Sequence, residues 1–535
     1  MTAHAAAPPR TRSSLGVLAR SAGMVAAIRG VDTILSFLVS VLLANRFGAS
    51  GQLDAFFLAR RTTVGFADTI RKLVGQVALP PVIAAADRGA PLTLAILPRR
   101  LTWFFVAFGV VMLAGILIPG VLVHLFAPGF RGAQHALTAR MMAIMMPLLP
   151  LAVIASLLAA VLQARRRYGL SEGTNLLQRA LLVLVLAVLV PPLGIVAGAW
   201  TMLASGIAGF AILLASAWSI VRPARCSAEA PPPPVAVPVA GGGLLAAVVL
   251  NGYFQISSLI DFAFASTTAD GGVAALEYGA RLVSLIPGLV MSSLATVLAP
   301  ELIHAVQQDD RAAAAAGIER FQRLVLFAQA PVSVGMMLGA PLMVGALFGH
   351  GKFDAAAIAA ASACTAGYAA AAVFLAPMSA ITSAIYADPH RPCLRDLTVI
   401  AVSGLALRAA MVALAAPVWG AGGIAWAAAA ATALTFVVAE AVAVRRFHHF
   451  HLARQLFELA RCLICAGVAA MAGGALLALV PTPQGTIAEL ALLAALGALV
   501  VAGYAAAALV LRVPEVAQLR ALVPALLARR KRRRA

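Results

Sequence analysis

The stretch from Ala199 to Val221, AWTMLASGIAGFAILLASAWSIV, decides the class of this protein. It carries no charged side chain, and as an α-helix it is long enough to cross about 30 Å of hydrocarbon. Arg222 and Arg225 follow it directly, and a run of four prolines from Pro231 to Pro234 comes next. An apolar helix that ends in basic residues is typical of a membrane span ending on the cytoplasmic side.

Similar apolar stretches recur along the whole chain of 535 residues. The composition is 62% hydrophobic and only 11% charged, whereas charged residues make up about a quarter of an ordinary soluble domain. No run alternates apolar and polar residues over ten positions, which argues against a β-barrel. The sequence therefore predicts an all-α polytopic membrane protein of about fourteen transmembrane helices, which begin near positions 24, 54, 101, 137, 174, 199, 240, 273, 317, 359, 396, 420, 457 and 487.

Basic residues indicate the orientation of these spans. The clusters precede the first span, follow the last one, or fall in even-numbered loops: Arg10, Arg12, Arg20, Arg99, Arg100, Arg165 to Arg167, Arg222, Arg225, Arg320, Arg323, Arg391, Arg395, Arg445, Arg446 and Arg529 to Arg534. Basic loops stay in the cytoplasm, so we expect both termini there and the protein in a bacterial inner membrane. The net charge of +20 comes from these loops, and we expect no nucleic-acid partner.

The two halves of the chain resemble each other at a nearly constant offset. Three pairs of segments lie 221, 222 and 223 residues apart: DAFFLAR from Asp54 with ALEYGAR from Ala275, LFAPGF from Leu125 with LFGHGKF from Leu347, and LQA from Leu162 with IYA from Ile385. The repeat contains six spans, an even number, so both copies enter the membrane in the same direction. Two parallel six-helix lobes around a central cavity are expected, with two further helices at the C-terminus.

This repeat sets the predicted domain boundaries. The N-terminal lobe takes residues 1–222, with spans one to six, and a cytoplasmic linker takes residues 223–239. The C-terminal lobe takes residues 240–446, with spans seven to twelve. Residues 447–535 hold the last two spans and a basic cytoplasmic tail.

Polar side chains inside the spans are the candidate site. A charge at the bilayer centre costs about 2.5 to 3.5 kcal/mol, so each needs a reason to be there. The leading two spans of each lobe carry polar stripes, and these include Arg29, Asp54, Asp261, Glu277 and Arg281. An arginine in a cavity suits a diphosphate, because its planar guanidinium binds two phosphate oxygens. The alternative is that these groups pair with one another and only hold helices together.

Several other classes of function find no support in the sequence. No G-x-x-x-x-G-K-[ST] loop is present for a nucleotide, so any transport would be secondary or passive. No catalytic or metal-ligating constellation falls on one face, and the pair Cys462 and Cys465 is expected to pack in the core. We therefore expect no enzyme activity, no metal and no cofactor.

Several stretches resemble the MurJ/MviN family of lipid-linked glycan flippases, and they occur in family order between residues 20 and 400. They are FGASGQLDAFF from Phe47, APGF from Ala127 with Pro147 downstream, LQARRRY from Leu162, Glu277 to Arg281, LATVLAPEL from Leu294 and LFGHGKFD from Leu347. The resemblance implies fourteen helices in two lobes, a cationic central cavity, and lipid II as the transported lipid. It also implies that the last two spans form a lipid-facing groove.

Single residues follow from this resemblance. Asp54 matches the family's acidic residue in the DAFF motif, Arg71 its arginine late in span two, and Arg281 its arginine in span eight. The family's span-one arginines fall on Thr33 and Val39, and Arg29 would substitute one turn earlier. The acidic neighbours of the span-eight arginine are replaced by Ala280 and Ser284, for which Glu277 would compensate. With Asp261 from span seven, these residues complete the predicted substrate site.

Three alternatives remain open at this point. The glycan could differ, as in a flippase for an O-antigen, capsule or exopolysaccharide unit. A cation-coupled exporter of the multidrug type would use a buried carboxylate such as Asp261. A membrane scaffold for cell-wall enzymes would close its polar stripes against each other. In the first reading the partners are the lipid-linked glycan, membrane lipids and cell-wall synthesis proteins.

Overall fold

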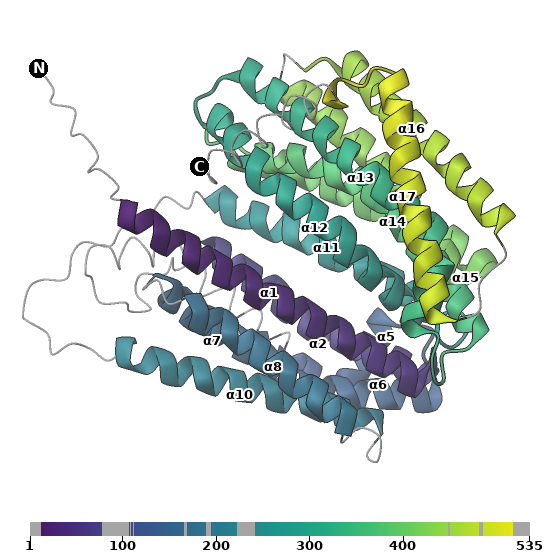
Figure 1. Cartoon of the computed structure of the whole chain (residues 1–535). Helices are drawn as coiled ribbons and strands as arrows, with labels where there is room; N and C mark the ends of the chain where they lie inside the picture. Colours follow the sequence, from purple (N-terminus) through teal and green to yellow (C-terminus); the bar gives the residue numbers. More distant parts are fainter. Residues whose placement is uncertain are drawn as a thin grey trace, which may run out of the picture. The chain divides into compact units, whose positions relative to one another are not determined.

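The protein is helical throughout the part that its computed structural model describes, which comprises residues 12–77, 106, 109–110, 112–164, 168–188, 194–221, 241–447, 450–480 and 485–516. No strand occurs within these ranges. Figure 1 shows long helices joined by short turns. This confirms the predicted all-α class. The linker 223–239 and the basic tail from 517 onward lie outside the described residues.

The chain forms two compact units. The first unit contains residues 1–42, 63–118 and 141–238. Its described helices are most of α1 (Arg12–Phe47) and the later part of α2 (Gly51–Val77), followed by α7 (Leu148–Ala164), α8 (Tyr168–Val188) and α10 (Ile195–Val221). Leu162 of α7 packs against Leu213 and Ala217 of α10 in a small apolar core.

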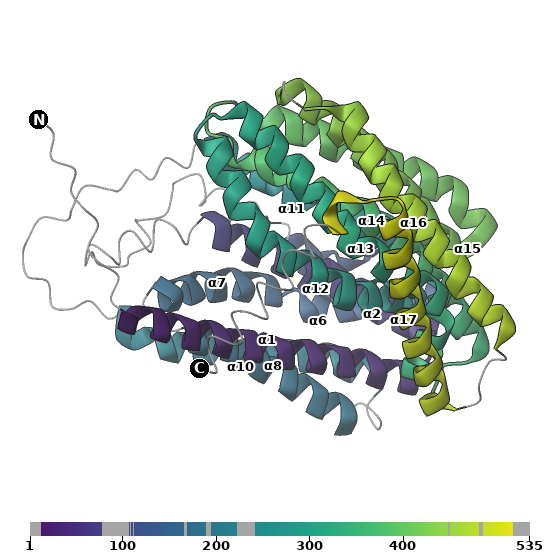
Figure 2. The same cartoon turned by 45° about the horizontal axis from the view of Figure 1, so that its top comes forward.

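The second unit contains residues 43–62, 119–140 and 239–535. It takes the adjoining ends of α1 and α2, then α5 (Pro119–Phe126), most of α6 (Gly132–Met145), α11 (Gly241–Ala265), α12 (Gly272–Gln307), α13 (Arg311–Phe348), α14 (Ala355–Ala387), α15 (Leu394–Arg446), α16 (Leu452–Leu479) and α17 (Thr486–Val510). The last two helices pack on each other and on α13 (Figures 1 and 2). One continuous apolar core runs through α11 to α17.

Helix α15 is two predicted spans in one element. Gly420 has φ 57° and ψ −147°, a backbone conformation that does not belong to a helix. Glycine populates positive φ without a steric penalty, so it allows the chain to turn there. The spans predicted to begin near 396 and 420 therefore correspond to the two segments on either side of this kink.

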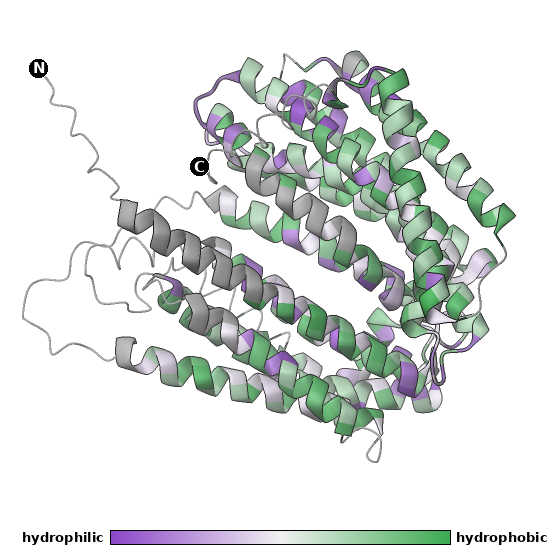
Figure 3. Ribbon diagram, in the orientation of Figure 1, coloured by the Kyte–Doolittle hydropathy of each residue, from purple (hydrophilic) through white to green (hydrophobic). Residues whose placement is uncertain are grey.

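The helices present the surface that a bilayer requires. Apolar residues cover the length of α16 and α17, and polar ones gather at helix ends (Figure 3). Large apolar side chains are exposed, including Leu414, Trp419, Leu479 and Ile487. Within the described ranges, nine helices are long and apolar enough to cross a membrane. The protein is thus a multi-pass membrane protein, and the total of about fourteen spans stays a prediction.

The order of the helices keeps the offset found in the sequence. Helix α2 begins at Gly51 and α12 at Gly272, which is 221 residues later. Helix α6 begins at Gly132 and α14 at Ala355, which is 223 residues later. Equivalent helices thus begin at equivalent points of the proposed repeat. The lobe boundaries and the superposition of the two lobes remain predictions.

Candidate functional site

Four short turns of the second unit meet in one place, which we call the four-turn junction. It consists of residues 48–50, 127–131, 266–271 and 349–354 together with the helix ends that they join. The backbone N–H of Lys352 donates to the carbonyl of Asn45 over 3.1 Å. The backbone N–H of Gly129 donates to Oγ of Ser266 over 3.0 Å. The junction therefore joins the two predicted lobes through direct hydrogen bonds.

Asp54 holds the centre of the junction. Its side chain is buried, and its two carboxylate oxygens accept the backbone N–H groups of Gly271 and Ala274, each over 2.7 Å. These groups belong to the start of α12, where the first N–H groups of a helix lack partners within it. A carboxylate there also interacts favourably with the helix dipole. Asp54 thus caps a helix that begins more than two hundred residues later in the chain.

Aromatic rings fill the space beside this cap. Tyr278 of α12 is fully buried. Its ring centroid lies 5.5 Å from that of Phe57, 4.8 Å from that of Phe348 and 5.4 Å from that of Phe353. Edge-to-face and tilted contacts at these separations are favourable. The motifs DAFF, ALEYGAR and LFGHGKF therefore contribute to one aromatic cluster.

Glycines permit the turns to approach this closely. Gly271 has φ 89°, and a β-carbon there would contact the backbone oxygen of Ala49. Gly351 has φ 66°, and its β-carbon would overlap Asn45. A side chain at either position would therefore require positive φ and would also force the turns apart.

Glu277 and Arg281 lie one turn apart on α12, near the junction. Glu277 forms an ion pair with Arg60 of α2, with an N–O distance of 3.6 Å. Arg281 is half-buried, and its carbonyl accepts the hydroxyl of Ser284 over 2.8 Å. The predicted residues Asp54, Glu277 and Arg281 are thus brought together where α2 meets α12.

Arg61, next to Arg60, contacts α11. The Arg61 guanidinium carbon lies 5.8 Å from the centroid of the Phe262 ring, and its backbone carbonyl accepts Nε2 of Gln255 over 3.1 Å. A cation over an aromatic face is attractive at this distance. Basic side chains from α2 and α12 therefore gather beside the start of α12.

Asp261 of α11 has a different environment. It is buried and pairs with Arg408 of α15, whose Nε and Nη2 donate to its two oxygens over 2.8 and 2.6 Å. The hydroxyl of Tyr368 on α14 donates to the same carboxylate over 2.8 Å. A two-point guanidinium contact satisfies both the charge and the geometry of a carboxylate. Asp261 thus joins three helices of the second unit.

The remaining predicted residues belong to the first unit. Arg29 lies in α1, but its side chain is outside the described residues. Arg71 of α2 is exposed and pairs with Asp68 over 3.3 Å. Asp32 of α1, from the span-one stripe, pairs with Arg179 of α8 over 3.3 Å. Contact of these residues with a substrate stays a prediction, as it does for those of the second unit.

Three participants were missed by the sequence reasoning. Arg60, Arg408 and Tyr368 supply the partners of Glu277 and Asp261. Arg408 stands alone as a charge inside an apolar helix, and an isolated intramembrane charge requires a partner. That signal could have identified it. Tyr368 offers no comparable signal, because a buried tyrosine is common in any core.

The comparisons with known proteins agree with these motifs. The model of the family described as lipid II flippase MurJ matches residues 43–495. A probable lipid II flippase MurJ from Rhizobium meliloti is 27% identical over 336 residues, which cover 60% of this chain and 61% of that protein. The lipid II flippase MurJ from Burkholderia cenocepacia is 24% identical over 59% of this chain and 62% of its own length. The chain thus matches a little over three fifths of the length of these curated relatives.

Solved structures with the same fold include two transporters. A lipid II flippase MurJ in an inward closed conformation superposes with a TM-score of 0.68 at 16% identity, covering 91% of this chain and 98% of that one. An inward-facing multidrug resistance transporter of the MATE family gives a TM-score of 0.58 at 14% identity over 78% of this chain and 95% of its own. Both show the predicted fold, and the family model covers most of the sequence. The chain belongs to the lipid II flippase MurJ family.

Proposed function

We propose that the protein translocates lipid II, a polyprenyl-diphosphate-linked glycan, across the inner membrane by alternating access. The family match over residues 43–495 carries this proposal. Its placement among flippases also agrees with the expectation that the chain is not an enzyme. Basic side chains near the start of α12, with Arg281 foremost, would bind the diphosphate through paired hydrogen bonds.

The four-turn junction supports the alternating-access part of the proposal. A carrier of this kind seals its pathway at one end while the other end opens. The junction has the features of such a seal, because it joins the predicted lobes through a buried cap, an aromatic cluster and close backbone contacts. It would have to separate when the substrate leaves on that side.

The Asp261 contacts speak against a cation-coupled exporter of the multidrug type. Such a mechanism needs a carboxylate that is open to a cation, whereas Arg408 and Tyr368 already occupy both oxygens of Asp261. A flippase for another lipid-linked oligosaccharide remains the runner-up, because Thr33 and Val39 replace two family arginines.

Complementation tests the substrate. The gene should restore growth to a strain depleted of its own lipid II flippase, and Arg281→Ala should not. A strain lacking its O-antigen or capsule flippase is the parallel test of the runner-up. Rescue of the second strain alone would overturn lipid II as the substrate.

A reversible cross-link tests the moving junction. A β-carbon on Gly51 would lie 3.3 Å from Cγ of Asp270, so Gly51→Cys with Asp270→Cys places two sulfurs within disulfide range. Oxidation should stop transport by the double variant, and a reductant should restore it. Each single cysteine variant is the control and should be insensitive to oxidation. Unchanged transport by the fully cross-linked protein would contradict alternating access at this junction.

A further inference from the structure

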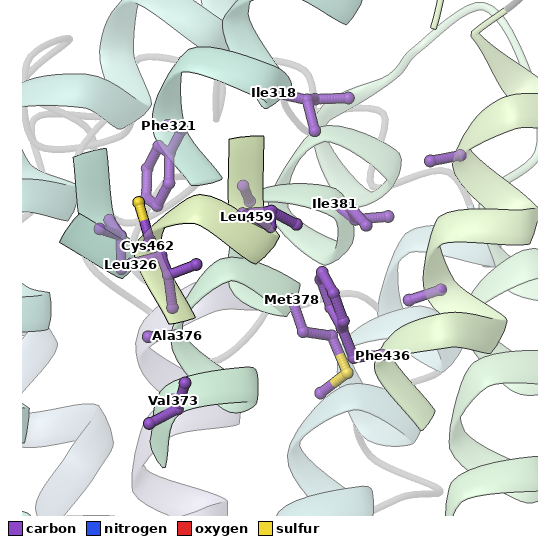
Figure 4. Packing of buried hydrophobic residues seen from close by; sticks show 14 of the residues in the cluster. Ile318, Phe321, Leu326, Val373, Ala376, Met378, Ile381, Phe436, Leu459 and Cys462 are labelled. Atoms are coloured by element: carbon purple, nitrogen blue, oxygen red, sulfur yellow. The ribbon is translucent and has the colours of Figure 1, made fainter. Parts of the chain in front are cut away.

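Three polar side chains are enclosed in the apolar core of the second unit. They are Gln322 of α13, Glu440 of α15 and Gln455 of α16, with exposed fractions of 0%, 2% and 0%. Each adjoins a residue of the apolar cluster in Figure 4: Gln322 follows Phe321, Glu440 lies one turn after Phe436, and Gln455 lies one turn before Leu459. We call these three residues the buried Glu–Gln triad.

The triad forms a chain of hydrogen bonds that ends in two oxygens. Nε2 of Gln455 donates to Oε1 of Gln322 over 2.8 Å, and Nε2 of Gln322 donates to Oε1 of Glu440 over 2.6 Å. Within the described part of the chain, Oε2 of Glu440 and Oε1 of Gln455 are buried and receive no hydrogen bond. Both are acceptors when the carboxylate is charged. A buried acceptor without a donor costs about 1 to 3 kcal/mol.

The charges around the triad do not neutralise Glu440. Arg323, one residue after Gln322, pairs with Glu515 over 3.1 Å and with Glu319 over 3.9 Å. The Asp388 and Asp396 side chains occupy the Arg446 guanidinium on α15. Helix α14, which packs on both α13 and α15, contains no charged residue. The titratable and charged groups that face the triad from the packed helices and the C-terminal segment are Glu319, Arg323, His451, Cys462, Tyr504 and Glu515.

We propose that the buried Glu–Gln triad is a proton-binding site in which Oε2 of Glu440 carries the proton. One proton removes the uncompensated negative charge that burial disfavours. It also turns Oε2 from an acceptor into a donor, and thus supplies what the two free oxygens lack. The proton comes from water and returns to it, so no other reactant is needed.

A metal cation fits the same place poorly. Hard cations are held by six or more oxygens at short range. The triad offers only two oxygens that are not already used, one on Glu440 and one on Gln455. A proton needs just one donor position and one acceptor. The site also joins α16 to α13 and α15, so release of the proton would weaken the attachment of α16.

Thermal unfolding of the full-length protein in detergent tests the site. The wild-type Tm should fall by several degrees between about pH 6 and about pH 9, because the folded state must then lose a proton that the unfolded state has already lost. Glu440→Gln should remove this part of the pH dependence and match the wild type at the lower pH. Its amide keeps the acceptor for Gln322 and places an N–H donor where the proton was.

Glu515→Gln is the matched control. Glu515 is another buried carboxylate of the same region, but it is paired with Arg323. Its amide variant should lower the Tm at both pH values and leave the pH dependence in place. An equal slope in Glu440→Gln and the wild type would overturn the proposal. Failure of Glu440→Gln to accumulate, while Glu515→Gln does, would overturn it too.

Infrared spectroscopy gives a direct readout. The wild type should show the band of a protonated carboxyl group, which disappears as the pH rises and is absent from Glu440→Gln. Replacing sodium with a bulky organic cation separates the metal alternative. A sodium-dependent rise in Tm at the higher pH, present in the wild type and lost in Glu440→Gln, would assign the site to a metal cation and refute the proton.

Discussion

At the residue scale, Asp54 shows where sequence reasoning stops. The sequence marks it as a charged residue in a polar stripe and in a family motif, and both point to the substrate. Its partners in the structure are the backbone groups of Gly271 and Ala274. No local pattern encodes a cap that comes from a distant helix, because the contact exists only once α2 and α12 are packed. The position of Asp54 on a functional helix could be predicted, and its partners could not.

The cap leads to a prediction for stability. Asp54→Asn replaces one acceptor oxygen with an N–H group that faces another donor, so the variant should lose about 1 to 3 kcal/mol. Thermal unfolding in detergent would measure this. Asp354→Asn is the control, since Asp354 caps α14 through Ala357 but is exposed, and its loss should be smaller. Equal losses would contradict a special role for the buried cap, and a transport defect at unchanged stability would favour a substrate contact.

Arg281 carries the second prediction. Arg281→Ala should abolish transport without reducing the amount of protein in the membrane, because removal of a membrane charge relieves an insertion cost. Glu277 would keep Arg60 as its ion-pair partner. Lysine should restore only part of the activity, since it lacks the planar fork that grips two phosphate oxygens.

Complementation and membrane levels measured together would check the role of Arg281. Arg320→Ala is the control, because Arg320 is exposed and pairs with Glu301 over 3.6 Å. It should transport normally. A stable Arg281→Ala protein with full transport would refute the assignment.

At the scale of helices, the contacts of Asp261 predict how α11, α14 and α15 are held together. Arg408→Ala would leave a buried carboxylate without its counter-charge and should cost about 3 to 5 kcal/mol. Adding Asp261→Asn should recover much of the loss, because both charges are then gone. A double-mutant cycle on thermal stability would measure the coupling. Additive losses would contradict the pairing.

Helix positions could be predicted well, because hydrophobic length is a local property. The kink in α15 at Gly420 falls where the sequence separates two spans. Charged helices were harder to judge. Helix α2 contains Asp54, Arg60, Arg61, Asp68, Arg71 and Lys72, and it is not among the nine helices that pass as spans on composition. Its assignment as a span rests on its position between other spans.

At the scale of the whole molecule, the junction explains why the family motifs are where they are. The motifs from Phe47, Ala127 and Leu347 are far apart in sequence, yet all of them contribute to the four-turn junction. The sequence showed that these stretches recur at a fixed offset. It could not show that they touch, because that depends on how the long helices between them pack.

Topology is the last prediction, and it follows from which loops meet. The four turns of the junction are the first, third, seventh and ninth loops of the fourteen-span assignment, so they share one side of the membrane. On the other side, Arg311 and Arg446 gather around Asp388 in the tenth loop, which is even-numbered and basic. An error of one span between the turns would place touching residues on opposite sides. The positive-inside rule then puts the junction outside and both termini in the cytoplasm. Reporter fusions after Ala535 and within the turn at Gly351 should therefore report opposite compartments, with a cytoplasmic signal at Ala535. The same compartment for both fusions would mean that the span count between them is wrong by one.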